Sequence, residues 1–234
     1  MCEIRLLFPV HMRTFFQDDT WQSGLEEIRV RVGQPIEFCY GSDNCYLTGK
    51  EKEQMFCSEK DYRRWEKDLY HASEADLREM LNYISNYSLY AYKEEIKQGY
   101  ITIEGGHRVG VAGQTVLVDG KIAGISPITF LNIRIAHEKC GCARKILPLI
   151  RQKNSIYNTL ILSMPGAGKT TLLRDSIRAL SNGEAYGIRL KVCVVDERSE
   201  IAASFHGVPQ NDMGPRTDVM DGCGKAEGMQ LLIP

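Results

Sequence analysis

The sequence lacks the features that would place it in several large classes of protein. Its 234 residues carry a net charge of -1, so it offers no basic field for nucleic acid or an anionic membrane surface. No run approaches the roughly 20 apolar residues of a membrane span. The chain also starts without the charged and apolar segments of an export signal. With eight scattered cysteines, these absences predict a cytoplasmic protein of a reducing compartment without nucleic-acid partners.

The cysteines also lack the spacing of a metal site. Cys140 and Cys142 form one close pair, but no second pair follows at the separation that a tetrahedral zinc site requires. We therefore interpret them as two free thiols and keep a redox role as the less favoured alternative.

What the sequence does contain is a succession of clear secondary-structure patterns. In chain order these predict a hairpin, two or three helices, a β-meander and a further helix, over residues 25–47, 58–98, 99–136 and 138–151. Ser73 is expected to cap a helix, and Asp119-Gly120 to turn a hairpin. The fold class is therefore α/β, with a mixed α+β N-terminal domain over residues 1–125 and a P-loop domain over residues 126–234.

The most informative stretch is TLILSMPGAGKTTLLRD, which runs from Thr159 to Asp175. An apolar strand is predicted to turn through a glycine loop into a helix. Backbone N–H groups in such a loop surround phosphates, because glycine permits the close approach that a side chain blocks. The helix dipole adds positive field at the same place. The expected nucleotide-binding residues are Ser163, Met164, Pro165, Gly166, Ala167, Gly168, Lys169, Thr170 and Thr171.

Two side chains of this loop have distinct expected roles. Lys169 reaches the terminal phosphates, and the Thr170 hydroxyl is a ligand of the accompanying Mg²⁺. The loop departs from G-x-x-x-x-G-K-[ST] because Ser163 occupies the first glycine position. That position lies where the strand leaves the sheet, so we expect little effect on phosphate binding. The alternative is a glycine-rich turn with a surface lysine.

A second motif, LKVCVVDERSE, ends an apolar strand in acidic residues. A strand of this kind delivers carboxylates to the phosphate edge of a sheet. Taken alone, VCVVDE fits a Walker B pattern, with Asp196 near Mg²⁺ and Glu197 as the base. Because this is the first strand after the phosphate helix, we favour Glu197 and Asp196 as acids that position water, supported by Glu200. An acidic strand end that caps a turn is the alternative.

The rest of the chain is rich in glycine and proline and is predicted to form a loop across the same edge. Arg216 and Lys225 are either phosphate sensors or solvated loop charges. On the predicted N-terminal hairpin, Arg29 and Arg31 are interpreted as a solvated strand face rather than an anion site.

Several motifs in order and spacing carry a family resemblance. These are EIRVRVGQPIEF, GYITIEGGHRVGVAG, SPITFLNIRIA, the phosphate loop, VVDERSEIAA and GPRTDVMDGCGKAEGM. Over nearly its whole length the chain resembles the stage III sporulation protein AA family of endospore-forming bacteria.

The resemblance implies a more specific function. That family resembles the hexameric ATPases of type II and type IV secretion, which implies a RecA-like domain, ATP and Mg²⁺, and a homo-oligomer. It also implies ATP hydrolysis coupled to a channel complex between mother cell and forespore. The other stage III A membrane proteins are then the partners, at the mother-cell face of that membrane. Asp196, Glu197 and Glu200 match the acidic box of secretion ATPases, and Arg134 matches an arginine that approaches nucleotide.

The chain departs from the family after the KAEGM motif, where relatives continue into an apolar strand that carries the Walker B acid. We therefore expect an incomplete RecA-like domain that binds nucleotide weakly and hydrolyses it very slowly. Two other functions stay open. One is a nucleotide-binding scaffold without turnover, and the other is a small-molecule kinase, for which the sequence shows neither an acceptor pocket nor a lid.

Overall fold

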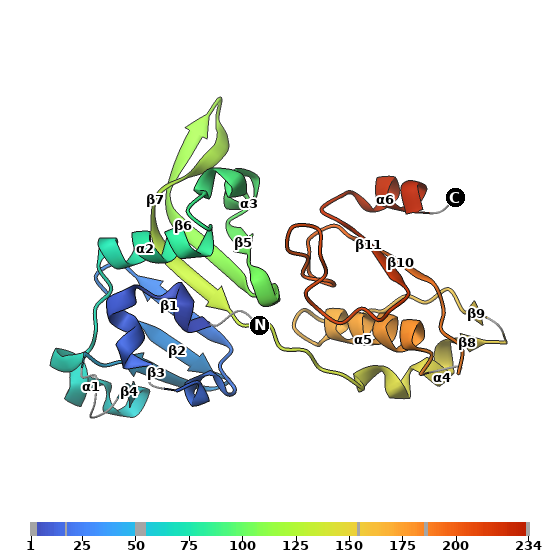
Figure 1. The fold of residues 1–234 in the computed structure, drawn as a ribbon, viewed down its shortest axis with the longest axis horizontal. Coiled ribbons are helices and arrows are strands. Elements are labelled where there is room, and N and C mark those ends of the chain that lie inside the picture. The colour runs from blue at the N-terminus through green and yellow to red at the C-terminus, as the bar shows by residue number, and fades with distance from the viewer. Residues whose placement is uncertain (1–3, 17, 50–54, 154, 185–186, 233–234) are drawn as a thin grey trace. The chain divides into compact units, whose positions relative to one another are not determined.

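The computed structural model describes residues 4–16, 18–49, 55–153, 155–184 and 187–232 (Figure 1). They form two compact units, Met1–Ala136 and His137–Pro234. The first is mixed α+β and the second is α/β, as predicted from the sequence. The boundary lies after residue 136 rather than at 125, because residue 125 falls inside a long strand that continues to Arg134.

A seven-stranded antiparallel sheet, in the order β4-β3-β2-β1-β7-β6-β5, forms the centre of the first unit. Its strands are β1 (Glu27–Arg31), β2 (Glu37–Tyr40), β3 (Asp43–Leu47), β4 (Phe56–Ser58), β5 (Tyr100–Thr102), β6 (Arg108–Val118) and β7 (Lys121–Arg134). The predicted turn at Asp119-Gly120 is confirmed, since both residues have positive φ between β6 and β7. This turn makes β6 and β7 a long hairpin, and β1 pairs with the other edge of β7.

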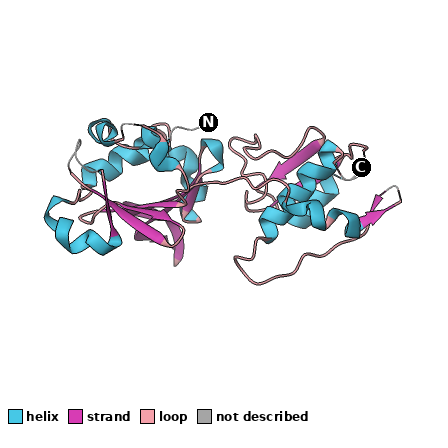
Figure 2. Cartoon of the chain, turned by 90° about the horizontal axis from the view of Figure 1, so that it is seen from below, coloured by secondary structure: helices cyan, strands magenta, loops and turns pink. Residues whose placement is uncertain are grey.

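Three α-helices accompany this sheet: α1 (Tyr62–Trp65), α2 (Glu74–Ile84) and α3 (Lys93–Lys97). Figure 2 shows most helical segments of the first unit on one side of the strands. The alternation along β1 agrees with this arrangement, because Ile28 and Val30 are fully buried while the alternating Arg29 and Arg31 are partly exposed. These arginines were interpreted as a solvated strand face. In the structure each forms an ion pair, Arg29 with Glu27 and Arg31 with Glu37.

Short 3-10 segments complete the first unit: η1 (Ile4–Leu7), η2 (Val10–Phe15), η3 (Thr20–Gln22), η4 (Glu59–Asp61), η5 (Glu66–Asp68), η6 (Leu89–Tyr92) and η7 (Glu104–Gly106). The segments near the start contribute aromatic side chains to the core. Phe8 and Phe16 lie with ring centroids 4.8 Å apart and contact the buried Phe38 of β2. Burial of such large rings contributes to the stability of this unit.

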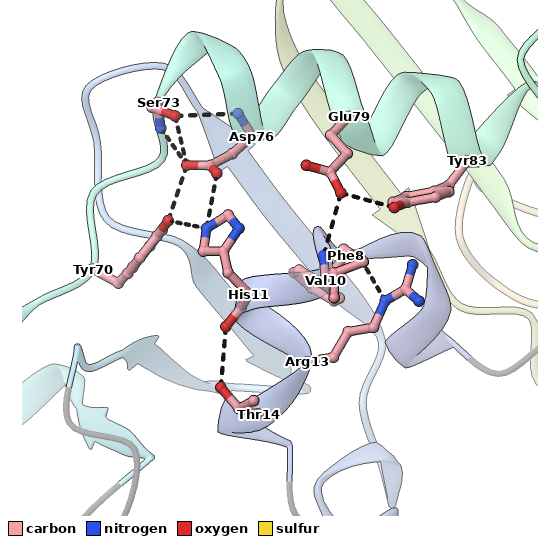
Figure 3. Close-up of polar contacts among 10 residues, drawn as sticks. All are labelled: Phe8, Val10, His11, Arg13, Thr14, Tyr70, Ser73, Asp76, Glu79 and Tyr83. Carbon is pink, nitrogen blue, oxygen red and sulfur yellow. Dashed lines mark hydrogen bonds and ion pairs between the residues drawn. The ribbon is translucent and has the colours of Figure 1, made fainter.

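Helix α2 begins with the predicted Ser73 cap, whose hydroxyl accepts the N–H of Asp76. The Asp76 carboxylate accepts the Ser73 N–H in return, at 2.8 Å, and so completes a capping box. Figure 3 shows that the same carboxylate also meets the Tyr70 hydroxyl, at 3.0 Å, and His11 Nε2, at 3.2 Å. Since His11 belongs to η2, this cluster fastens the start of the chain to α2.

The second unit consists of η8 (Cys142–Lys145), α4 (Leu147–Ile150), β8 (Arg151–Gln152), β9 (Ser155–Ile156), α5 (Lys169–Asn182), β10 (Val192–Asp196), β11 (Thr217–Asp221) and α6 (Lys225–Leu232). Strands β10 and β11 are parallel, and β8 pairs with β9 antiparallel. The helix predicted over residues 138–151 is therefore shorter, and β8 follows it directly. The predicted loop after the acidic motif contains β11 and α6.

Helix α5 lies at the centre of the second unit. Its residues Ala179 and Leu180 pack with Ala143 and Leu147 from the segment before the loop. On another side, Ile177 packs with Val194 of β10, and with Ala202 and Met213. Both clusters fix α5 relative to the end of β10. None of the helices that the structure describes is long and apolar enough to cross a membrane.

Candidate phosphate-binding site

The phosphate loop has the backbone conformation that its glycines allow. Gly166 and Gly168 have φ of 77° and 84°, in the left-handed region that side-chain-bearing residues rarely adopt. No heavy atom of the described residues beyond the chain neighbours lies within 4 Å of the place where a Cβ of either glycine would be. The loop therefore leaves open space at its two glycines.

Helix α5 starts directly from this loop. Gly168 is its N-cap and supplies no side chain, so within the described residues the first turn carries no side-chain cap. The amides at a helix start have no partner inside the helix and attract anions together with the helix dipole. A loop of this conformation, opening on an uncapped helix, fits a phosphate group.

Lys169 folds back over the loop. Its Nζ donates to the carbonyl oxygens of Ser163 and Met164, each at 3.0 Å, and lies 3.3 Å from Ser163 Oγ. The carbonyl of Ser163 is a backbone group that any residue supplies, so serine preserves this contact of the loop's first position. These partners are uncharged, and the lysine charge is therefore available to an anion.

The strand predicted ahead of the loop is not formed. Residues 157–164 adopt no regular secondary structure and have no ladder partner among the residues that the structure describes. Leu160 and Leu162 are each 79% exposed, whereas the sequence pattern had indicated a buried strand. A strand needs a hydrogen-bonded neighbour, and β10 here pairs with β11.

Asp196 ends β10 and is 2% exposed. Its carboxylate accepts three backbone N–H groups, those of Glu200, Ile201 and Ala202, at distances between 2.8 and 3.0 Å. The aspartate therefore organises the loop that follows β10, which we call the acidic loop (residues 197–202). This arrangement agrees with the turn-capping alternative for Asp196. Its predicted roles toward water and Mg²⁺ stay predictions.

Arg174 connects the acidic loop to α5. Its Nε donates to the carbonyl of Ile201 and its Nη2 to that of Glu200, both at 2.7 Å. Burial lowers the pKa of Arg174, and nearby carboxylates oppose this effect. Sequence reasoning missed this residue, because its position on a helix gives no sign of a contact 26 residues away.

The Glu197 side chain forms an ion pair with Lys225. Its Oε2 lies 2.7 Å from Nζ of Lys225, the first residue of α6. The Glu197 side chain is 44% exposed and that of Lys225 is 70% exposed. The hydrogen bond from Lys225, followed by its charge, lowers the pKa of Glu197. Glu197 is therefore ionised at neutral pH.

A cleft of about 220 Å³ brings the predicted groups together. Its lining is drawn from the start of α5, the end of β10, the acidic loop, α6 and the segment before the phosphate loop: Ile161, Lys169, Thr170, Leu173, Val195, Asp196, Glu197, Arg198, Glu200, Ile201 and Lys225. The cleft thus joins the lysine and threonine of the phosphate loop to all three predicted acidic residues. Such a set can hold a phosphate chain, a hydrated Mg²⁺ and an attacking water.

Asp221 is a carboxylate that the sequence reasoning missed. It lies opposite Asp196 in the parallel register of β10 and β11, and Ser199 Oγ donates to both of its oxygens, at 2.7 and 2.9 Å. Burial raises the pKa of Asp221, and the charge of Asp196 adds to that effect. The available sequence signal is its place at the end of the short stretch TDVMD, the same position that Asp196 has in VCVVD.

Two other basic residues were predicted to approach the nucleotide, Arg216 and Arg134. Arg216 precedes β11, at the end remote from Asp221, and its guanidinium donates to the carbonyl of Arg189 at 2.9 Å. Of the two proposed sensors, only Lys225 lines the cleft. Arg134 ends β7 in the first unit, and its approach to nucleotide stays a prediction.

The second unit defines the chain as a P-loop α/β protein. Residues 2–234 match the family described as sporulation stage III, protein AA, and the chain belongs to that family. It is 40% identical over 235 residues to stage III sporulation protein AA of Bacillus subtilis (strain 168), covering 100% of this chain and 69% of that protein.

Among solved structures, the chain is similar to the Legionella pneumophila ATPase DotB, with a TM-score of 0.45 and 18% sequence identity. The similarity covers 91% of this chain and 51% of that one. The chain thus spans about half the length of this structural relative.

Proposed function

We propose that this protein is a P-loop ATPase that binds ATP with Mg²⁺ in the cleft of its second unit. The observation that carries the proposal is the uncapped start of α5, which opens on a cleft containing both Lys169 and Glu197. The loop amides and Lys169 hold the phosphates, and the Thr170 hydroxyl is a ligand of Mg²⁺. Held by Thr170, with Asp196 nearby, Mg²⁺ would supply positive charge to offset the negative charge of the phosphates.

Glu197 is the residue that we assign to positioning the attacking water. It is ionised, lies on the cleft and has a side chain that the loop architecture does not use. Asp196 supports it by fixing the acidic loop through three backbone amides. In the reaction, water attacks the terminal phosphorus, the bond to the bridging oxygen breaks, and Glu197 orients the water and accepts its proton.

We further propose that hydrolysis drives a sporulation channel complex between mother cell and forespore. Family membership supports a role in sporulation. The resemblance to secretion ATPases supports a homo-oligomer, with Arg134 approaching nucleotide. The proposed partners are the other stage III A membrane proteins, on the mother-cell side.

The second candidate is a nucleotide-binding scaffold without turnover. It is favoured by the ion pair that occupies Glu197 and by the hydrogen bonds that the Asp196 carboxylate accepts from the acidic loop. Single-turnover hydrolysis separates the two candidates. With protein in excess over radiolabelled ATP and with Mg²⁺, the ATPase releases phosphate without any acceptor molecule, and the variant Glu197→Gln binds ATP without releasing phosphate. Binding by the wild type with no release of phosphate overturns the ATPase proposal and leaves the scaffold.

A further inference from the structure

Lys225 is held beside the cleft by the packing of α6. The helix approaches β10 at Gly228, where an added Cβ would lie 2.5 Å from Cγ1 of Val195 and 2.8 Å from Sγ of Cys223. Only glycine permits this approach. Lys225 lies three residues earlier, at the first position of α6, and its amine therefore comes to the end of β10. The packing at Gly228 thus sets where the backbone of Lys225 lies, and the ion pair with Glu197 then fixes the amine.

The two lysines of the cleft differ in their partners. Lys169 donates to neutral carbonyl oxygens, whereas Lys225 faces the carboxylate of Glu197 at 2.7 Å. An ion pair between side chains this exposed is weak, because water screens it. A phosphate group with more than one negative charge, placed in the same cleft, competes effectively for the Lys225 amine. Glu197 loses its partner when that exchange occurs.

We propose that Lys225 distinguishes nucleoside triphosphate from diphosphate by exchanging the carboxylate of Glu197 for the terminal phosphate. This proposal rests on the function proposed above and assigns to it a specificity-determining residue. With diphosphate, Lys225 stays on Glu197 and the acid remains occupied. With triphosphate, Lys225 moves to the third phosphate, and the freed Glu197 carboxylate accepts a hydrogen bond from water. The same exchange places a cation beside the terminal phosphate, where it can stabilise the charge on the phosphoryl oxygens during cleavage.

The test is calorimetric titration of the 234-residue chain with ATPγS and with ADP, each with Mg²⁺. In Lys225→Met the affinity for ATPγS falls about tenfold, the worth of one charged hydrogen bond, while that for ADP stays within about twofold. Lys225→Arg retains most of the difference. The matched control is Lys191→Met, which removes an exposed lysine at the opposite end of β10 and leaves both affinities unchanged.

A second variant separates this role from a structural one. Glu197→Gln removes the competitor of the phosphate, so it increases the affinity for ATPγS in the wild-type background. In the Lys225→Met background the same substitution has no such effect. A merely structural Lys225 gives additive changes instead. Equal weakening of ATPγS and ADP by Lys225→Met, or additivity, overturns the inference and leaves the ATPase proposal intact. A wild-type chain that binds neither nucleotide overturns both.

Discussion

Helices α2 and α5 begin in opposite ways, and the contrast separates the two units of the molecule. At the start of α2, Ser73 and Asp76 satisfy each other's backbone amides in a capping box. At the start of α5, Gly168 supplies no side chain, and Lys169 rests on neutral carbonyls. The first unit thus uses its polar groups to hold itself together. The second unit leaves the start of α5 open to an anion. The missing cap lowers the stability of the free protein, and a bound anion would offset that loss.

The largest effect is expected from removing Lys169, the cation at the open start of α5. Lys169→Ala should weaken ATPγS binding about a hundredfold, because two or more charge-assisted contacts to phosphate are lost. Calorimetric titration measures this loss, and fluorescence of the buried Trp21 monitors the first unit. Lys145→Ala is the control, since it removes an exposed lysine of the same unit. Undiminished binding by Lys169→Ala would place the phosphates elsewhere.

The converse substitution is in the capped helix. Asp76→Ala should reduce the free energy of unfolding of the first unit by about 2 kcal/mol, because the capping box and the contacts to Tyr70 and His11 are lost together. Urea unfolding followed by tryptophan fluorescence measures the change. Glu74→Ala, at an exposed position in the same turn, should change stability by only a few tenths of a kcal/mol. A large effect of Asp76→Ala on nucleotide affinity would contradict the separation of roles.

The sequence predicts the two helix starts better than the structure around them. Ser73, the phosphate loop and the acidic motif were found because each depends on neighbours a few residues apart. Strand β11 was missed because its TDVMD stretch lies between glycine- and proline-containing segments, where strand periodicity is hard to detect.

The same limit explains the errors around the site. The strand predicted before the phosphate loop is not formed, since an apolar pattern does not reveal whether a neighbouring strand is present. The two contacts of Arg174 with the acidic loop, and the packing of Gly228 on Val195, arise from tertiary structure. The sequence therefore predicted the chemical groups of the cleft better than the residues that position them.

A substitution of Arg174 should have a smaller effect, and it separates the role of the acidic loop from that of the phosphate loop. Arg174→Ala should slow single-turnover hydrolysis about tenfold, since losing two hydrogen bonds releases the acidic loop that carries Glu197. Affinity for ATPγS should stay nearly constant, because the phosphate loop is untouched. Arg174→Lys keeps the charge but not the two-point contact, and should recover little of the rate. Equal losses of rate and affinity would assign Arg174 to the phosphates instead.

The smallest expected effect concerns acid stability. Burial raises the pKa of Asp175, but hydrogen bonds from the amides of Ala143 and Gly141 and from Arg178 outweigh it, so the pKa lies below its ordinary value of 3.8. A depressed pKa contributes stability above pH 3.8 that is lost as the pH falls through the folded-state value. Asp175→Asn should therefore destabilise the second unit at pH 7 and remove this acid dependence. Urea unfolding at pH 7 and pH 3, followed by NMR of α5 amides, measures both; an unchanged acid dependence would contradict the assignment.

The most direct test of the open helix start is amide NMR of the isotopically labelled chain during titration with ATPγS and Mg²⁺. We predict large, saturable shifts of the amide resonances of Gly166, Gly168 and Lys169, with smaller shifts at Glu197 and Lys225 and none at the capped start of α2. Saturable binding that leaves the three loop amides unmoved would contradict the account.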